Sequence, residues 1–600
     1  MDGRPVALSN ESFDTIRKND MLYVDKTGLL VDLCKDVLSG KTSVHIYTRP
    51  TRFGKTLNQS MIDRFFNVAY ADDPDVFGGL EISGHREFEH LKNMFPVIRL
   101  NMSLLDPSDL DTAKRSLLDV TRDAYSKVRQ QYGTGWMSAP ILKLFDELMY
   151  GDASESSASF HMMRLSRILD TELTDAHGAK VNRPPIILMD EYDAFIQKRI
   201  HPEQYDSITG MIADFMEATF KTNTDFSLGV ITGILMLSQT GIISGLNNPI
   251  IHTLFDQGSG KYFGYTEDEV KTLVSSFVPD RYDKGRVMRE IRDMYDGYTF
   301  GGYELYNPRS VNMYISEGRF DQPPGEYWER SRRNVLLDDI LFSADDRTQD
   351  DIANLLLYDG KSQPAVIVPS TVFKDILDGN PSPNRIYSIL VMTGYLRATT
   401  TEPCNDQNTV MCDVSIPSKE MRHAYDSLLR RVRNRRSEGS GFFDAILDTD
   451  GEKATNEFNN HIQSWSVRDS WTHDMCKDRL VQYCLQYGYV AKTENPLGNG
   501  YIDVFVEGDP DQPLPNIYFE ITTSDEAGTS DMDSILDICV RKFDERKYVD
   551  SDRDGVFVAV AWDRRFTKMR VLRYDDIRKR RPARFRVKRG RSKNRLTEGS

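Results

Sequence analysis

Short apolar segments alternate with amphipathic helical segments through residues 1–260, and this alternation limits the possible folds more than any other feature. The four expected strands are Thr42–Tyr47, Pro96–Asn101, Ile186–Asp190 and Ser227–Thr232. Between them apolar residues recur at the spacing of a helix face, as in Leu57–Phe66. The run Ile186–Met189 is apolar on both faces, which is typical of a buried parallel strand. We therefore expect an α/β fold in which helices cover a parallel sheet.

A phosphate-binding motif lies between the first of these strands and the helix that follows it. The segment Arg49–Thr56 ends in Gly54-Lys55-Thr56, but Arg49 stands where a Walker A motif has its first glycine. In such a loop the backbone N–H groups at the helix N-terminus bind phosphate. Lys55 would then reach the β- and γ-phosphates, and the Thr56 hydroxyl would hold Mg²⁺. The triplet alone also fits a helix start with a solvated lysine.

A second motif ends the third strand, where four apolar residues are followed by Asp190 and Glu191. This pattern is typical of a Walker B strand. Asp190 would bind Mg²⁺, and Glu191 would act as the general base on the attacking water. A buried strand that ends in a solvated acidic turn is the alternative. The two motifs in this order predict ATP and Mg²⁺ as cofactors, with Gly54, Lys55, Thr56 and Asp190 as ligands and Lys55 and Glu191 as catalytic residues.

Polar breaks divide the chain of 600 residues, which is long enough for about two to four domains. We expect an ATPase domain over residues 1–320 and a mostly helical middle domain over 326–434. A further α/β domain is expected over 442–575, with strand patterns at Tyr501–Glu507, Ile517–Thr522 and Gly555–Trp562. A basic tail follows over 576–600.

Composition excludes several classes of protein. The six cysteines are scattered without a C-x-x-C pair, so a zinc site or a disulfide framework is not expected. Residues 1–10 lack the pattern of a signal peptide. The most apolar stretch, Phe226–Ile243, contains polar residues that fit a buried strand and turn rather than a membrane helix. We therefore expect an intracellular protein without membrane contact, in a state of oligomerisation that the sequence leaves open.

Many short motifs resemble one known family in their order along the chain. The sequence resembles AAA-ATPase-like proteins that carry a C-terminal domain of the PD-(D/E)XK nuclease superfamily, a family whose Walker A motif also lacks the first glycine. This resemblance implies a P-loop NTPase sheet, a helical middle and a restriction-endonuclease-like C-terminal domain. The matching segments are Tyr23–Thr27, Arg49–Thr56, Asp190–Asp193, Thr232–Gly233, Ser244–Asn248, Phe263–Thr266, Tyr295–Tyr298, Tyr306–Pro308, Tyr327–Trp328, Thr393–Leu396 and Ile416–Glu420.

The resemblance also implies a metal site in the C-terminal domain, with Glu494, Asp503 and Glu520 as ligands. Such a site needs acids that hold Mg²⁺ and a lysine that positions water. The lysine position, two residues after Glu520, holds Thr522, which cannot supply positive charge. Lys542 or Lys547 on the following helix could substitute. Two outcomes stay open: a weakly active nuclease, or a fold that kept its sheet and lost its chemistry.

The C-terminal tail is strongly basic although the whole chain has a net charge of −15. Eleven Lys or Arg residues and no acid lie between Arg578 and Arg595. Such a segment could bind DNA or RNA phosphates, or it could direct nuclear import in a eukaryotic host. A solubilising tail is the third interpretation. Two functions follow for the chain: an ATPase that drives or gates a nucleic-acid-processing domain, or a nucleotide-regulated scaffold with an inert nuclease-like domain.

Overall fold

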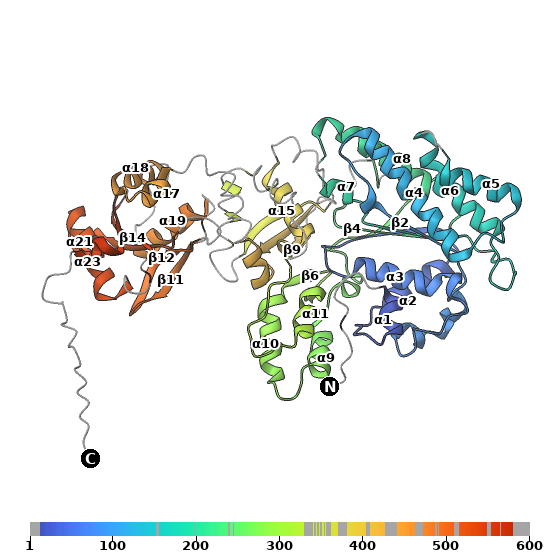
Figure 1. Ribbon diagram of the computed structural model, residues 1–600, viewed down its shortest axis with the longest axis horizontal. Helices are drawn as coiled ribbons and strands as arrows, with labels where there is room; N and C mark the ends of the chain where they lie inside the picture. Colours follow the sequence, from blue (N-terminus) through green and yellow to red (C-terminus); the bar gives the residue numbers. More distant parts are fainter. Residues whose placement is uncertain are drawn as a thin grey trace, which may run out of the picture. The chain divides into compact units, whose positions relative to one another are not determined.

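The structure is a computed structural model that divides into two compact units, Met1–Tyr425 and Asp426–Ser600. Each unit is described by itself below (Figure 1). The structure describes residues 6, 12–151, 155–198, 200–237, 241–243, 245–328, 340, 344, 347–348, 351–352, 355, 362–369, 381–403, 409–425, 441–462, 472–486, 489, 491–508, 515–548, 552, 554–564 and 566–579.

A parallel five-stranded sheet forms the centre of the first unit, as the sequence predicts. The strand order is β2-β3-β4-β1-β5. Strand β4 therefore lies between the strand that precedes the phosphate loop and the strand that ends in Asp190, and it pairs in parallel with both. The five strands are β1 (Ser43–Thr48), β2 (Val97–Asn101), β3 (Ile186–Asp190), β4 (Leu228–Gly233) and β5 (Ile250–His252). All five end at the same edge of the sheet, where their loops meet.

Helices cover both faces of this sheet (Figure 1). Helix α3 (Lys55–Phe66) packs on one face together with α1 (Phe13–Lys18) and α2 (Gly28–Leu38). The opposite face is covered by α4 (Leu110–Tyr132), α6 (Glu155–Glu172) and α8 (Tyr205–Phe220), and α5 (Ala139–Tyr150) packs beside α4. The Met61, Ile62, Phe65 and Phe66 side chains of α3 are all buried, because this helix is enclosed on several sides.

Beyond the sheet, three helices share a separate apolar core. Val270, Ile291 and Val311 are fully buried in it, one from each helix. These helices are α9 (Glu267–Phe277), α10 (Lys284–Tyr295) and α11 (Pro308–Glu317). A short hairpin of β6 (Tyr298–Phe300) and β7 (Tyr303–Leu305) separates α10 from α11. A capping box begins α9, in which Thr266 and Glu269 bond each other's backbone N–H groups.

The middle of the chain contains a sheet that we did not expect. For residues 326–434 we expected a mostly helical segment, and within the described part three strands form an antiparallel sheet in the order β8-β10-β9. These strands are β8 (Gln363–Ile367), β9 (Arg397–Pro403) and β10 (Val410–Ser415), and helix α15 (Pro383–Thr393) accompanies them. Three consecutive threonines in β9 favour a strand over a helix, since β-branched side chains fit a pleated surface.

One buried carboxylate anchors this middle segment to the three-helix core. Glu420 is 3% exposed and accepts hydrogen bonds from the backbone N–H groups of Tyr327 and Trp328 and from the Ser310 hydroxyl. The Trp328 ring also stacks on Tyr298 of β6. These contacts join residues from both sides of the expected boundary at 320–326, and the described residues up to Tyr425 fall within the first unit.

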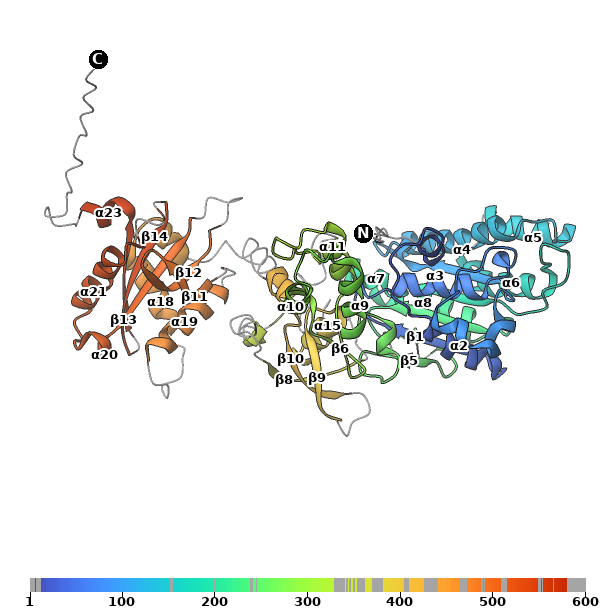
Figure 2. The same ribbon diagram turned by 90° about the horizontal axis from the view of Figure 1, so that it is seen from below.

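The second unit is a mixed five-stranded sheet in chain order, β11-β12-β13-β14-β15. Only β13 and β14 pair in parallel. Helix α21 packs on one face, and α18 and α19 lie on the other (Figure 2). The strands are β11 (Ala491–Leu497), β12 (Gly500–Val506), β13 (Ile517–Thr523), β14 (Val556–Asp563) and β15 (Phe566–Arg573). The helices are α17 (Gly441–Leu447), α18 (Gly451–Ile462), α19 (His473–Gln486), α20 (Ser524–Ala527), α21 (Met532–Glu545) and α23 (Tyr574–Lys579).

Candidate functional site

The phosphate loop has the backbone shape that an anion site requires. Arg52 and Gly54 have φ angles of 72° and 84°, and helix α3 begins directly after them at Lys55. Among the residues with described positions, no side chain caps this helix, and a Cβ added at Gly54 would meet nothing within 4 Å. The first N–H groups of an α-helix lack intrahelical partners and attract anions. The loop therefore fits the phosphates of a nucleotide.

Lys55 is held inside this loop. Its Nζ donates to the carbonyl oxygens of Arg49 and Pro50, each at 2.9 Å. Burial lowers the pKa of the ammonium, while the nearby carboxylates of Asp190 and Asp193 oppose that shift. A bound phosphate would offer charged oxygens in place of the two neutral carbonyls, and a charged acceptor forms the stronger bond. Lys55 is therefore placed to exchange its partners when a nucleotide binds.

The Arg49 side chain is not positioned as a phosphate ligand. It is fully buried, and Nη1 donates to the carbonyl oxygens of Thr48, His252 and Thr253 at 2.7 to 2.8 Å. Nη2 donates to the Ser259 hydroxyl at 2.8 Å. Burial lowers the pKa of the guanidinium to about 10, which leaves it charged at neutral pH. The residue that replaces the first Walker A glycine thus fastens the loop to the chain that follows β5.

Hydrogen bonds connect the two nucleotide motifs directly. The Thr56 hydroxyl donates to Asp190 Oδ2 at 2.7 Å, and the Thr232 hydroxyl at the end of β4 donates to Asp190 Oδ1. Gln59 on α3 completes the group, since its Nε2 donates to the Met189 carbonyl and to Thr232 Oγ1, each at 2.8 Å. The sequence analysis included Thr232 among the matching segments but missed Gln59, whose only signal is a polar residue on the buried side of α3.

The residues after Asp190 are held in an uncommon conformation. Glu191 has a φ angle of 53°, a region that non-glycine residues rarely adopt and that often marks a functional position. Asp193 is fully buried and accepts hydrogen bonds from the N–H groups of Ile234 and Leu235. Burial raises the pKa of Asp193 to about 6, and these N–H donors oppose the shift. Asp193 therefore fixes the loop after β4, whereas Glu191 is partly exposed at the strand end.

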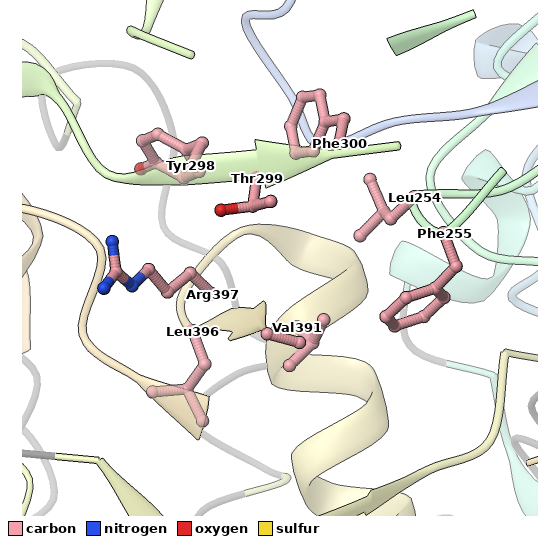
Figure 3. A pocket seen from close by; sticks show the side chains of 9 residues that line it. Leu254, Phe255, Tyr298, Thr299, Phe300, Val391, Leu396 and Arg397 are labelled. Carbon is pink, nitrogen blue, oxygen red and sulfur yellow. The ribbon is translucent and has the colours of Figure 1, made fainter. Parts of the chain in front are cut away.

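A small pocket lies where the middle segment meets the hairpin, away from both motifs (Figure 3). Its lining comes from β6, from the loop after β5, from the end of α15 and from the start of β9. The residues are Leu254, Phe255, Tyr298, Thr299, Phe300, Val391, Leu396, Arg397 and Ala398. The lining contains neither phosphate-loop residues nor Asp190 or Glu191, so this pocket is not the nucleotide site.

In the second unit, two of the three predicted metal ligands lie close together. Asp503 on β12 and Glu520 on β13 are 6% and 0% exposed. Burial, together with the Asp503 carboxylate, raises the pKa of Glu520 to about 7, while Lys542 and Arg546 oppose that shift. Lys542 Nζ lies 2.9 Å from Glu520 Oε1 and donates to Thr522 Oγ1 at 3.2 Å. Lys542 and Lys547 were the two proposed substitutes for the missing lysine. The ammonium of Lys542 contacts both Thr522 and Glu520.

Glu494 does not join these two carboxylates. Its neighbours on β11 pair with Ile502 and Val504, so the register places Glu494 opposite Asp503. Its φ angle is 51°, however, and its carboxylate forms an ion pair with Lys477 on α19. Within the described ranges, no group of three or more His, Cys, Asp or Glu side chains is arranged to hold a metal ion. The structure therefore does not bring the predicted three-acid site together.

Two further expectations concern segments at the limits of the structure. Residues 580–600 of the basic tail and Ser244 of the matching segment Ser244–Asn248 lie outside the described residues. In the part of the chain that is described, no helix is both long and apolar enough to cross a membrane.

Comparison with known proteins supports the nucleotide motifs. Residues 7–243, which include both motifs, match the AAA-ATPase-like family, described as a predicted AAA-ATPase. The chain is 24% identical over 346 residues to the "Uncharacterized protein in vnfD 5'region" of Azotobacter chroococcum mcd 1, and the match covers 57% of each protein. The chain thus spans just over half the length of that relative. A chain from "Structure of Drosophila ORC bound to DNA" aligns at 12% identity with a TM-score of 0.25, covering 72% of this chain and 95% of that one. The N-terminal part of the protein is therefore similar to predicted AAA-ATPases.

Proposed function

We propose that the first unit binds ATP with Mg²⁺ and hydrolyses it. The observation that carries this proposal is the hydrogen bond between Thr56 and Asp190. A hydroxyl at the start of the phosphate-loop helix and a carboxylate at a strand end are the two ligands that hold Mg²⁺ in P-loop enzymes. Here they come from segments far apart in sequence and meet at the edge where the strands end.

Each residue of the site has a distinct role in the proposed reaction. The N–H groups around Gly54 and the Lys55 ammonium bind the phosphates, and Thr56 and Asp190 hold the magnesium ion. Bound Mg²⁺ supplies neutralisation of the charge on the β- and γ-phosphates. Glu191 accepts a proton from the attacking water. Thr232 and Gln59 keep the Asp190 carboxylate oriented through their hydrogen bonds.

Two variants separate binding from turnover. Lys55→Ala should lose most ATP affinity in calorimetry, because the only ammonium inside the described loop is removed. Glu191→Gln should bind ATP normally and turn it over roughly 10²–10⁴-fold more slowly, because an amide cannot accept the proton. Glu217→Gln is the matched control, since Glu217 forms an exposed ion pair with Lys221. Unchanged ATP affinity in Lys55→Ala, or normal turnover in Glu191→Gln, would exclude the assigned role.

For the second unit we propose a nuclease-like domain that associates with nucleic acid. The order α19-β11-β12-β13-α20-α21-β14 and the adjacent Asp503 and Glu520 carboxylates support this assignment. Coupling to the first unit predicts that DNA or RNA changes the rate of ATP turnover by the full chain. The same rate with and without either polymer, across a range of salt concentrations, would count against coupling.

A nucleotide-regulated scaffold with an inert second unit is the other candidate function. It is favoured by the arrangement of protein donors around the two carboxylates, because Glu520 pairs with Lys542 and Asp503 lies against His473. Cleavage of plasmid DNA by the purified protein with Mg²⁺ separates the two functions. Cleavage that disappears in Asp503→Ala indicates a nuclease, and absence of cleavage by the natural sequence indicates the scaffold.

A further inference from the structure

A histidine lies at the position where the carboxylate of β12 meets the backbone of β13. His473, the first residue of α19, has its Nε2 3.2 Å from the Ile521 carbonyl oxygen and 3.4 Å from Asp503 Oδ2. A carbonyl oxygen only accepts hydrogen bonds, so Nε2 carries the proton at this contact. Asp503 Oδ2 also accepts the N–H of Ile521 at 2.7 Å. The imidazole N–H therefore faces two oxygen atoms from two adjacent strands.

A lysine ammonium lies against the neighbouring carboxylate. Lys542 Nζ is 2.9 Å from Glu520 Oε1, and Arg546 Nη1 is 3.8 Å from the same oxygen. Glu520 Oε2 is buried and has no hydrogen-bond partner among the described residues. Buried carboxylates are costly unless they are paired. In this unit the pairing comes from side chains on two helices that pack on opposite faces of the sheet.

The oxygen atoms around His473 are of the kind that bind a hard divalent cation. Mg²⁺ and Mn²⁺ prefer carboxylate and carbonyl oxygens, and a site of this kind needs several of them at once. The Asp503 carboxylate and the Ile521 carbonyl are two such ligands, and both are already in contact with His473. The predicted third acid, Glu494, is paired with Lys477. The residues present therefore do not fit a divalent ion in this arrangement.

We propose that His473 takes the place of the divalent cation in this site, holding Asp503 and the Ile521 carbonyl, while Lys542 balances Glu520. The inference rests on the proposed nuclease-like character of the second unit. It states whether this unit binds a metal ion at Asp503. The natural chain has no Asp503-dependent metal site, because the ligands of that site already bind protein donors. His473 thus determines whether a protein donor or a metal ion lies beside Asp503. Its removal should allow a metal ion to bind to Asp503 and the Ile521 carbonyl.

Binding of Mn²⁺ to the nucleotide-free full chain tests this directly, with free Mn²⁺ measured by its paramagnetic resonance signal. All proteins carry Asp190→Asn, so that the first unit's metal ligand does not contribute. We expect no Asp503-dependent site in this parent. His473→Ala should gain one such site, so that Mn²⁺ binds on the order of tenfold or more tightly than to the parent. Adding Asp503→Ala should remove it.

Two further variants keep the test decisive. Lys477→Ala removes a cation one helical turn along α19, where it pairs with Glu494 and Asp474, and should gain no Asp503-dependent site. His473→Asn repeats the test with a polar side chain, and circular dichroism of each variant verifies its folding. An Asp503-dependent Mn²⁺ site in the parent, an equal gain in Lys477→Ala, or no gain in either folded His473 variant would overturn the inference.

The proposed association with nucleic acid is measured separately on the same proteins, by a mobility shift without metal. A chain that fails to bind DNA or RNA overturns the proposed function of the second unit and leaves the Mn²⁺ result standing. A parent that binds nucleic acid and also shows an Asp503-dependent Mn²⁺ site supports the proposed function and overturns the role of His473.

Discussion

Replacing Gly394 by alanine should weaken ATP binding, although Gly394 belongs to the middle segment. Gly394 ends helix α15 in the left-handed conformation, with a φ angle of 85°. A Cβ added there would lie 2.8 Å from Pro50 Cβ and 3.4 Å from the Trp328 ring. Pro50 is part of the phosphate loop, and its carbonyl accepts a hydrogen bond from Lys55. The middle segment thus contacts the loop at a position where only glycine fits.

The expected magnitude has two parts. A left-handed conformation costs an alanine about 1–2 kcal/mol. Contact with Pro50 adds about 1–3 kcal/mol, as overpacking does elsewhere in protein cores. Gly318→Ala is the control, and only the first of these two energies applies to it. Gly318 ends α11 with a φ angle of 63°, and an added Cβ meets no described atom within 4 Å. If the loop shifts to relieve the contact, ATP affinity falls roughly 5- to 100-fold.

Calorimetric titration with ATP and urea unfolding of both variants provide the assay. Both variants should lose stability, and only Gly394→Ala should lose ATP affinity. Equal ATP affinity in Gly394→Ala, Gly318→Ala and the parent chain would refute the reasoning, because the loop would then be insensitive to the contact with α15. An equal loss in both variants would also refute it, since general destabilisation would explain the result.

Three other predictions concern separate parts of the chain. Thr522→Lys should not raise cleavage of plasmid DNA, because it brings a second ammonium against Lys542; a clear rise would contradict the placement of Lys542. Burial lowers the pKa of His161 to about 4, below the ordinary value near 6.5, so the unfolded chain binds the extra proton between these values. Stability should therefore fall by about 3 kcal/mol as pH falls from 6.5 to 4, and urea unfolding of His161→Gln should show a smaller dependence. Removal of residues 580–600 should reduce nucleic-acid affinity and its salt dependence while ATP turnover persists; identical binding curves would assign the tail a solubilising role.

The sequence by itself determined the architecture around the nucleotide motifs. Strand, loop and helix at Arg49–Thr56 follow from local patterns, since apolar periodicity and a glycine before a helix act over a few residues. The apolar run before Asp190 predicted its strand for the same reason. These motifs met as expected because parallel strands place their C-terminal ends at one edge of the sheet. The resemblance carried by the shorter motifs added the nuclease-like assignment, which stays a prediction.

Only the tertiary structure decided what the individual polar side chains do. Arg49 turns into the chain after β5, Glu494 pairs with Lys477, and Lys542 reaches Thr522 from α21. His473 carried no sequence signal, because its partners are an acid and a carbonyl on strands that follow it. A polar side chain in a protein interior takes the partner that satisfies its charge and hydrogen bonds, and packing selects that partner among residues distant in sequence. For this reason local patterns located the carboxylates but could not reveal which cations occupy the space beside them.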